Sequence, residues 1–168
     1  MKWLLSLFVI ASMLTGCGDG TVHSGVEGFI TQIVSDDRLL IGDTVYHITR
    51  DTQIQDSDGD ALKKDDLKIG MKVQPFYTGP LEEKFPQHAE AKLLRILVDE
   101  DSKKANVMMI NVLYQLKHNE DEHFIITDVV HQEDQGVYVM NVMRRSNVDI
   151  DFTITVSDES YEILYMEA

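Results

Sequence analysis

The stretch AEAKLLRILV, residues 89–98, decides how the first half of this chain of 168 residues folds. Successive side chains in a β-strand point to opposite faces of a sheet, and this run of ten residues alternates in that way without glycine or proline. We therefore predict a strand, with Ala89, Ala91, Leu93 and Arg95 on one face and Glu90, Lys92, Leu94 and Ile96 on the other.

Shorter segments of the same kind precede it. VEGFITQIV (26–34), a turn at Asp36 and Asp37, RLLIG (38–42) and TVYHIT (44–49) follow one another at the spacing of a β-meander. Next come a strand in DTQIQ (51–55), a tight turn, a short helical or turn segment ending at Leu67, and a strand through residues 71–76. About five strands in so short a segment suit a small closed barrel such as an OB-fold. We predict an OB-like β-barrel domain over residues 26–99.

A longer piece of this region carries a family resemblance. LKIGMKVQPFYTGPLEEKFPQHAEAKLLRI (67–96), preceded by DSDGD (56–60), contains a strand, a Gly-Pro loop with a second proline, and a returning strand. This pattern resembles an uncharacterised domain of small lipoproteins of Gram-positive bacteria. The resemblance covers about residues 26–98 and implies an OB-like domain of unknown function, so it brings no activity to this chain.

Residues 100–168 show a different pattern. After the charged segment DEDSKK (99–104), apolar residues fall at helical spacing, and Ser102 suits the N-cap of a helix. The polar segment KHNEDEH (117–123) ends this helix, and strands follow at 123–131, 137–145 and 148–156, with a short final strand at 161–166. We predict an α+β domain, one helix on a 3–4-stranded antiparallel sheet. The helical positions that we expect to be apolar and packed are Val107, Ile110, Tyr114 and Lys117 with Met109, Leu113 and Leu116.

The N-terminal residues 1–17 predict the cellular location of the protein. Lys2 and the apolar run from Trp3 to Leu14 have the charge and length of a signal peptide, and the run is too short to span a bilayer. The sequence Leu-Thr-Gly-Cys that ends at Cys17 resembles the lipobox of bacterial lipoproteins. The resemblance implies a signal peptide over residues 1–16, cleavage before Cys17 and lipid transfer to its thiol. Two acyl chains give stable anchoring, so we expect a cell-membrane lipoprotein on the extracytoplasmic face.

Two further features concern the mature chain. Residues 17–25 are rich in glycine and polar residues and are interpreted as a flexible tether. Cys17 is the only cysteine, so a lipidated chain has no thiol left for a disulfide, a metal site or a nucleophile.

The net charge of −14 excludes some partners. Residues 26–98 hold 9 Lys or Arg against 13 Asp or Glu, and residues 99–168 hold 5 against 15. Such a field repels phosphate backbones, so nucleic-acid binding is not expected, whereas cations or basic partners are attracted. The simpler interpretation is that the acidity keeps the protein soluble above an anionic membrane.

Metal and catalytic motifs are weak. The segment DSDGD places Asp56, Asp58 and Asp60 around a glycine, which invites a calcium interpretation, but it lacks the EF-hand order, and a turn with Gly59 at positive φ is favoured. His118 and His123 flank NEDE, where a weak divalent site is one interpretation and a solvated loop the other. The six histidines form no HExxH motif, and no serine lies in a GxSxG or SxxK arrangement. Methionines 108, 109, 140 and 143 are interpreted as core residues rather than copper ligands.

The best candidate for a binding site is the segment TGPLEEKFPQHAEA, residues 78–91. A long connection between barrel strands has to pack on the barrel or bind something. Phe85 precedes Pro86, and its ring either closes over the barrel as a lid or faces solvent beside Tyr77 and Leu81 as an anchor for a partner. The sequence therefore predicts a lipid-anchored binding or interaction module with a possible envelope protein as its partner, no cofactor and no enzymatic activity. The alternative is binding of a cation or small ligand.

Overall fold

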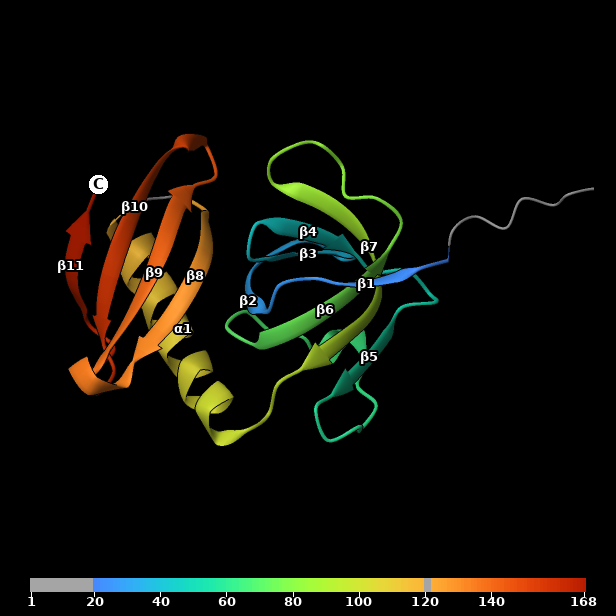
Figure 1. Cartoon of the computed structure of the whole chain (residues 1–168), viewed down its shortest axis with the longest axis horizontal. Coiled ribbons are helices and arrows are strands. Elements are labelled where there is room, and N and C mark those ends of the chain that lie inside the picture. Colours follow the sequence, from blue (N-terminus) through green and yellow to red (C-terminus); the bar gives the residue numbers. More distant parts are fainter. Residues whose placement is uncertain (1–19, 120–121) are drawn as a thin grey trace, which may run out of the picture.

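The computed structural model describes residues 20–119 and 122–168 and shows two β-rich units side by side (Figure 1). The first unit is a closed five-stranded barrel, and the second is a four-stranded antiparallel sheet with one helix packed on it. The predicted fold class, an OB-like barrel followed by a helix on an antiparallel sheet, is confirmed. Within the described residues, no helix has both the length and the apolar character needed to cross a membrane.

The first unit contains seven strands. They are β1 (Val22–Ser24), β2 (Gly28–Ser35), β3 (Arg38–Ile41), β4 (Thr44–His47), β5 (Gln53–Asp56), β6 (Lys72–Thr78) and β7 (Gln87–Ile96). Five of them close the barrel in the order β6–β2–β3–β4–β7, because β7 pairs with both β4 and β6. The β4–β7 pair is parallel, and the other pairs of the ring are antiparallel. β1 extends the sheet beside β6, and β5 pairs with the second half of β7.

Strand β7 confirms the predicted strand but not its strict alternation. Phe76 of β6 pairs with Leu93, whereas Tyr77 pairs with Ala91, so Lys92 has no partner on β6 and forms a bulge. A bulge adds one residue to a strand and reverses the faces beyond it, which also bends the strand around the barrel. The buried residues are therefore Ala89 and Ala91 before the bulge and Leu94 and Ile96 after it.

The predicted tether is wrong for its last residues. Val22 to Ser24 form β1 and pair antiparallel with the end of β6. The amide of Gly25 then donates to the Pro75 carbonyl at 2.9 Å, and a side chain at Gly25 would collide with the Tyr46 hydroxyl. The ordered sheet thus begins before residue 26, because backbone pairing with β6 orders a segment whose composition alone resembles a linker.

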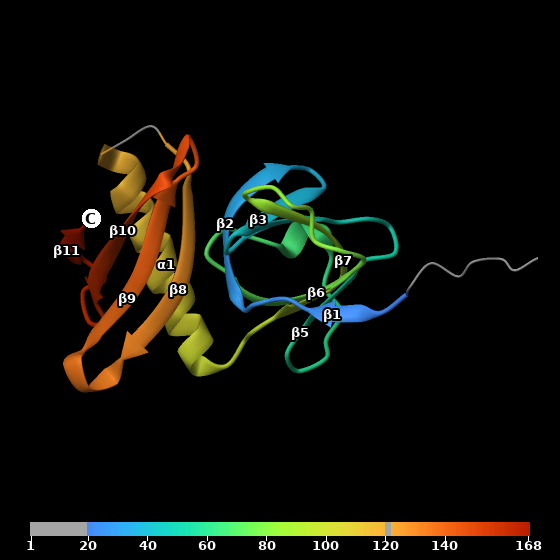
Figure 2. The same ribbon diagram turned by 45° about the horizontal axis from the view of Figure 1, so that its top comes forward.

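The second unit follows a short turn. Its elements are α1 (Glu100–Asn119), β8 (Phe124–Gln132), β9 (Val137–Arg144), β10 (Asn147–Ser157) and β11 (Ile163–Glu167). The sheet order is β11–β10–β9–β8, every pair is antiparallel, and α1 lies across one face (Figure 2). The predicted strands and helix are confirmed.

Two details of the predicted helix are wrong. The N-cap is Asp99 rather than Ser102, because the two carboxylate oxygens of Asp99 accept the Ser102 amide at 2.9 Å and the Ser102 hydroxyl at 2.7 Å. The packed face is only partly as predicted. Met109, Leu113 and Leu116 are buried in the core. Val107, Ile110 and Tyr114 are about half exposed or more, and Lys117 is exposed. The residues that pack on the sheet are Ala105, Met108, Met109, Val112, Leu113 and Leu116.

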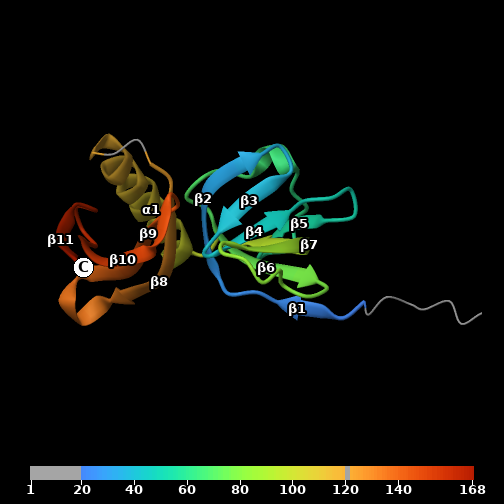
Figure 3. The ribbon, with the colours of Figure 1, turned by 90° about the horizontal axis from the view of Figure 1, so that it is seen from above.

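The two units share packed side chains. Phe29 of β2 is buried in the core between α1 and the sheet. On β8, Ile126 faces that core, whereas its neighbour Ile125 packs against Leu40 and Val45 on the outer wall of the barrel. Seen from above, β8 is the strand of the sheet that lies closest to β2 (Figure 3). The predicted domains are therefore joined by a common apolar junction.

Candidate functional site

A cleft of about 570 Å³ opens beside this junction. We call it the barrel–sheet cleft. Its barrel wall consists of residues 24–29, residues 41–44, Tyr46, Lys72, Tyr77, Leu81, Phe85 and Gln87, and its sheet wall consists of residues 126–130 and Met143. A volume of this size is within the range of small-ligand sites, about 300–1,000 Å³.

All three residues predicted as a ligand or partner site line this cleft. Tyr77 is on β6, and Leu81 and Phe85 are on the loop from β6 to β7. Tyr77 and Leu81 pack partly against the barrel core, whereas the Phe85 side chain is 45% exposed at the cleft. The structure therefore does not bury the Phe85 ring on the barrel as a lid, and its role as an anchor for a partner stays a prediction. The Phe85–Pro86 peptide bond is cis.

The loop that carries Leu81 and Phe85 is tied to the barrel at its end. The amide of Gln87 donates to the backbone carbonyl of Asp43 at 2.9 Å, at the turn between β3 and β4. The Asp43 carboxylate accepts the Thr44 hydroxyl at 2.9 Å. The hydrogen bond between Gln87 and Asp43 therefore links the β6–β7 loop to the β3–β4 turn, and both segments contribute residues to the cleft.

The sheet wall contains a residue that the sequence analysis missed. Asp128 interrupts the apolar run of β8 and has a positive φ of 52°, at a bulge where the pairing with β9 shifts between Thr127 and Val130. Its carboxylate accepts the Thr127 hydroxyl at 3.1 Å and the Asn141 side-chain amide at 3.2 Å. Asp tolerates a positive φ better than most residues do. The only signal in the sequence is an acidic residue within FIITDVV.

The charges of the cleft are predominantly negative. Its ionisable acids and bases are Glu27, Asp43, Asp128 and Lys72, and Lys72 forms an ion pair with Glu27 at 3.4 Å. Among the described residues, no ion pair involves Asp43 or Asp128. Burial raises the pKa of the Tyr46 phenol to about 12, so this ring stays neutral near pH 7.

The DSDGD segment forms the predicted turn. One oxygen of the Asp56 carboxylate accepts the amides of Asp58 at 3.0 Å and Asp60 at 2.9 Å, and Gly59 has a φ of 97°. The aspartate side chain thus stabilises the turn by satisfying backbone donors. Nowhere in residues 20–119 and 122–168 do three or more His, Cys, Asp or Glu side chains form a group placed to hold a metal ion.

The histidines are dispersed. His47 contacts Asp37 at 2.9 Å, and His131 contacts Asp158 at 3.0 Å. The side chain of His118, one of the pair that flanks NEDE, lies outside the described part of the structure.

The methionines are core residues as predicted, because Met108, Met109 and Met140 are fully buried and Met143 packs at the junction.

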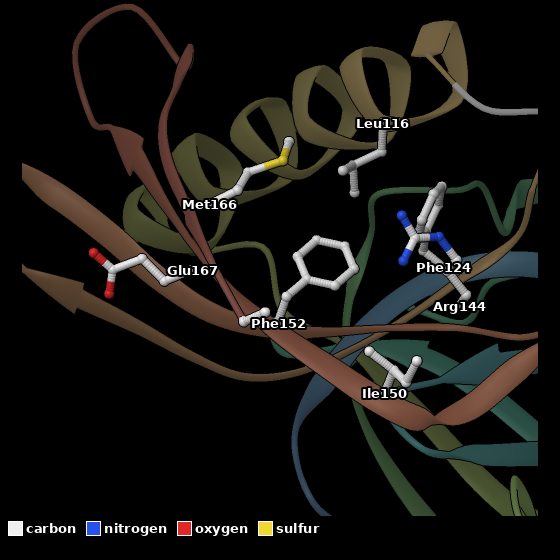
Figure 4. A pocket seen from close by; sticks show the side chains of 8 residues that line it. Leu116, Phe124, Arg144, Ile150, Phe152, Met166 and Glu167 are labelled. Atoms are coloured by element: carbon white, nitrogen blue, oxygen red, sulfur yellow. The ribbon is translucent and has the colours of Figure 1, made fainter.

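A second, smaller cavity of about 290 Å³ lies within the C-terminal unit, between the end of α1 and the sheet (Figure 4). The Arg144 guanidinium lies 5.3 Å from the centre of the Phe152 ring, which closes one side of the cavity. The other residues that line it are Leu116, Phe124, Ile150, Met166, Glu167 and Ala168. The barrel–sheet cleft is about twice as large and contains all the predicted binding residues, so it is the stronger candidate.

Comparison with protein-family models, curated proteins and solved structures finds no match to this chain. The function therefore has to be argued from the site itself. Cys17 and the segment before it lie outside the described residues, so lipidation stays a prediction of the sequence.

Proposed function

We propose that this protein is a lipid-anchored lipoprotein of the cell envelope that acts as a binding module, with its ligand in the barrel–sheet cleft. The observation that carries the proposal is that Tyr77, Leu81 and Phe85 meet in one cavity of ligand size. Aromatic and aliphatic side chains provide apolar contact area, and the polar groups of the two walls provide orientation.

The arrangement of the barrel also supports this location. OB-folds commonly bind ligands on the face of their second and third strands and with the loop between the fourth and fifth. In this barrel β3 and β4 are the second and third strands, and their outer residues Leu40 and Val45 are buried under Ile125. The loop from β6 to β7 joins the fourth and fifth strands and lines the cleft. The protein's own sheet thus covers the usual face and leaves the loop end accessible.

A small ligand or a short segment of a partner suits this site better than a broad protein surface. Protein partners commonly use extended exposed patches, whereas small molecules occupy concave sites. Phe85 sits at a cavity of about 570 Å³ and not on a flat patch. Phosphate-rich ligands are disfavoured because the cleft carries three carboxylates and one lysine.

The location of the ligand is testable by methyl NMR. The full chain in phosphatidylcholine nanodiscs is titrated with a panel of small aromatic, aliphatic and sugar fragments. We expect saturable shifts at the methyl groups of Val130 and Met143, which line the cleft, and not at Met109 in the core of the second unit. Leu81→Ala should weaken these shifts. A panel whose members all bind elsewhere, or not at all, would disprove a ligand site in the cleft.

The anchor is tested separately. Cys17→Ser removes the predicted acceptor thiol, so we expect loss of lipid labelling and of processing before residue 17, with the barrel still folded. Metabolic labelling with a fatty acid and membrane fractionation measure the effect. Unchanged lipid incorporation in Cys17→Ser would show that the lipobox interpretation is wrong.

A further inference from the structure

We infer that the ligand of the barrel–sheet cleft is an organic cation, an amine or guanidinium group attached to an apolar body. This inference rests on the proposed function and adds the chemical class of the ligand. The starting point is the cavity itself, whose lining residues include Phe29, Tyr46, Tyr77 and Phe85. Phe29 and Tyr46 are almost fully buried, so the rings accessible to a ligand are those of Tyr77 and Phe85. Rings attract cations to their faces, and this attraction is stronger where water is partly excluded.

Carboxylates stand on both walls. Asp43 belongs to the barrel wall and Asp128 to the sheet wall. Among the described residues that line the cleft, Lys72 is the only cation, and it is already paired with Glu27 at 3.4 Å. In the described part of the chain, the side-chain donors to the other two carboxylates are the hydroxyls of Thr44 and Thr127 and the amide of Asn141. A cation in the cleft would therefore be attracted from both sides.

Asp128 is held in place before any ligand binds. Its donors Thr127 and Asn141 come from neighbouring positions on β8 and β9, and Asn141 in turn accepts the Thr153 hydroxyl at 3.1 Å. This row of hydrogen bonds restricts the carboxylate, so less ordering entropy is lost when a cation binds. The row crosses three strands of a rigid sheet, which is a better support for a charge than a free loop.

The net charge of the whole protein also favours a positively charged ligand. With a net charge of −14, the protein attracts cations over distances of about a Debye length and repels anions. The apolar members of the cleft, among them Leu81, Val129 and Met143, suit a hydrocarbon body next to the charged group. Hydrated metal ions lack such a body, and no metal-binding group is found in the described residues.

Three matched probes test the inference on the full chain in phosphatidylcholine nanodiscs. Benzylammonium, benzyl alcohol and benzoate have similar size and carry a positive, no and a negative charge. Their affinities are measured from the methyl shifts of Val130 and Met143. We expect benzylammonium to bind at least about fivefold more tightly than benzyl alcohol, benzoate to bind most weakly, and added salt to weaken only the cation.

Substitutions with matched controls locate the charge. Asp43→Asn and Asp128→Asn keep the hydrogen-bond acceptor, and Asn tolerates the positive φ of residue 128. Each should weaken benzylammonium severalfold and leave benzyl alcohol unchanged. The controls Asp65→Asn on the barrel and Asp149→Asn on the sheet change the net charge equally at exposed positions outside the cleft and should have little effect.

The outcomes separate the two proposals. Equal binding of benzylammonium and benzyl alcohol in the cleft would overturn the cation inference and leave the binding function standing. Equal weakening by the controls and by the cleft variants would also overturn it, because the attraction would then be diffuse. If none of the three probes, and no member of the fragment panel, shifts the cleft methyl groups, both proposals fail together.

Discussion

The junction between barrel and sheet has two halves of opposite character. In the closed half, Phe29, Leu40 and Ile125 are buried, and water is excluded between the two units. In the open half, the same β2 and β8 continue into a cleft with carboxylates on both walls. The bulge at Asp128 marks the change on β8, because Phe124, Ile125 and Ile126 are all buried before it, whereas Asp128 and Val130 are exposed. The comparison indicates that the closed half fixes the geometry and the open half is available for a ligand.

The largest effect is expected from the closed half. Phe29→Ala leaves a cavity between α1 and the sheet and removes a ring that joins the two units, so we expect a loss of about 3–5 kcal/mol in the free energy of unfolding. Chemical denaturation measures it. Because the ring belongs to both units, one cooperative transition is expected in the wild type.

A loss below about 1 kcal/mol for Phe29→Ala, or two separate transitions in the wild type, would contradict a shared core. In that case the barrel and the sheet would be independent domains, and the cleft between them would lose its fixed geometry.

The sequence predicts the secondary structure elements of the two halves better than it predicts which residues of these elements are buried. The strands and the helix follow from apolar periodicity. The candidate site at Tyr77 of β6 and at Leu81 and Phe85 of the following loop is predicted from the length of the loop and from its aromatic residue. The faces of β7 were predicted wrongly, because a bulge at Lys92 depends on pairing with β6 and leaves no local signal. The N-cap was misplaced by three residues, since both Asp99 and Ser102 are good capping residues.

The packing of the two units against each other could not be predicted from the sequence, for a different reason. Phe29, Leu40 and Ile125 read as ordinary apolar strand residues, and the pattern of one strand does not say which distant strand covers it. Asp43 and Asp128 lie 85 positions apart in the sequence, and only the tertiary fold brings them to one cleft. A charged residue within an apolar strand was the single available hint.

A stabilising effect of intermediate size is expected from a substitution at Thr31 of β2. Its hydroxyl is buried, the residue is 2% exposed, and no hydrogen-bond partner is present in the described structure. Thr31→Val replaces this hydroxyl with a methyl group of similar size, so we expect stabilisation by about 1 kcal/mol, or a rise of about 2–4 °C in Tm. Scanning calorimetry measures the change.

The control for this substitution is Thr44→Val. Thr44 is buried to a similar degree, 4% exposed, but its hydroxyl donates to Asp43 at 2.9 Å. The same change should therefore lower Tm at residue 44. Equal effects of the two variants would mean that the Thr31 hydroxyl has a partner such as a bound water molecule.

The smallest effect on stability is expected in the open half, at Phe85. Its ring is 45% exposed at the cleft and belongs to none of the buried core clusters, so Phe85→Ala should change the free energy of unfolding by no more than about 0.5 kcal/mol. Binding of aromatic fragments to the cleft should nevertheless weaken severalfold, because the ring supplies contact area to the ligand. Denaturation and the methyl titration measure the two quantities on the same sample. A loss of about 3–5 kcal/mol would instead place the ring in the barrel core as a lid, and the loop would then belong to the closed half.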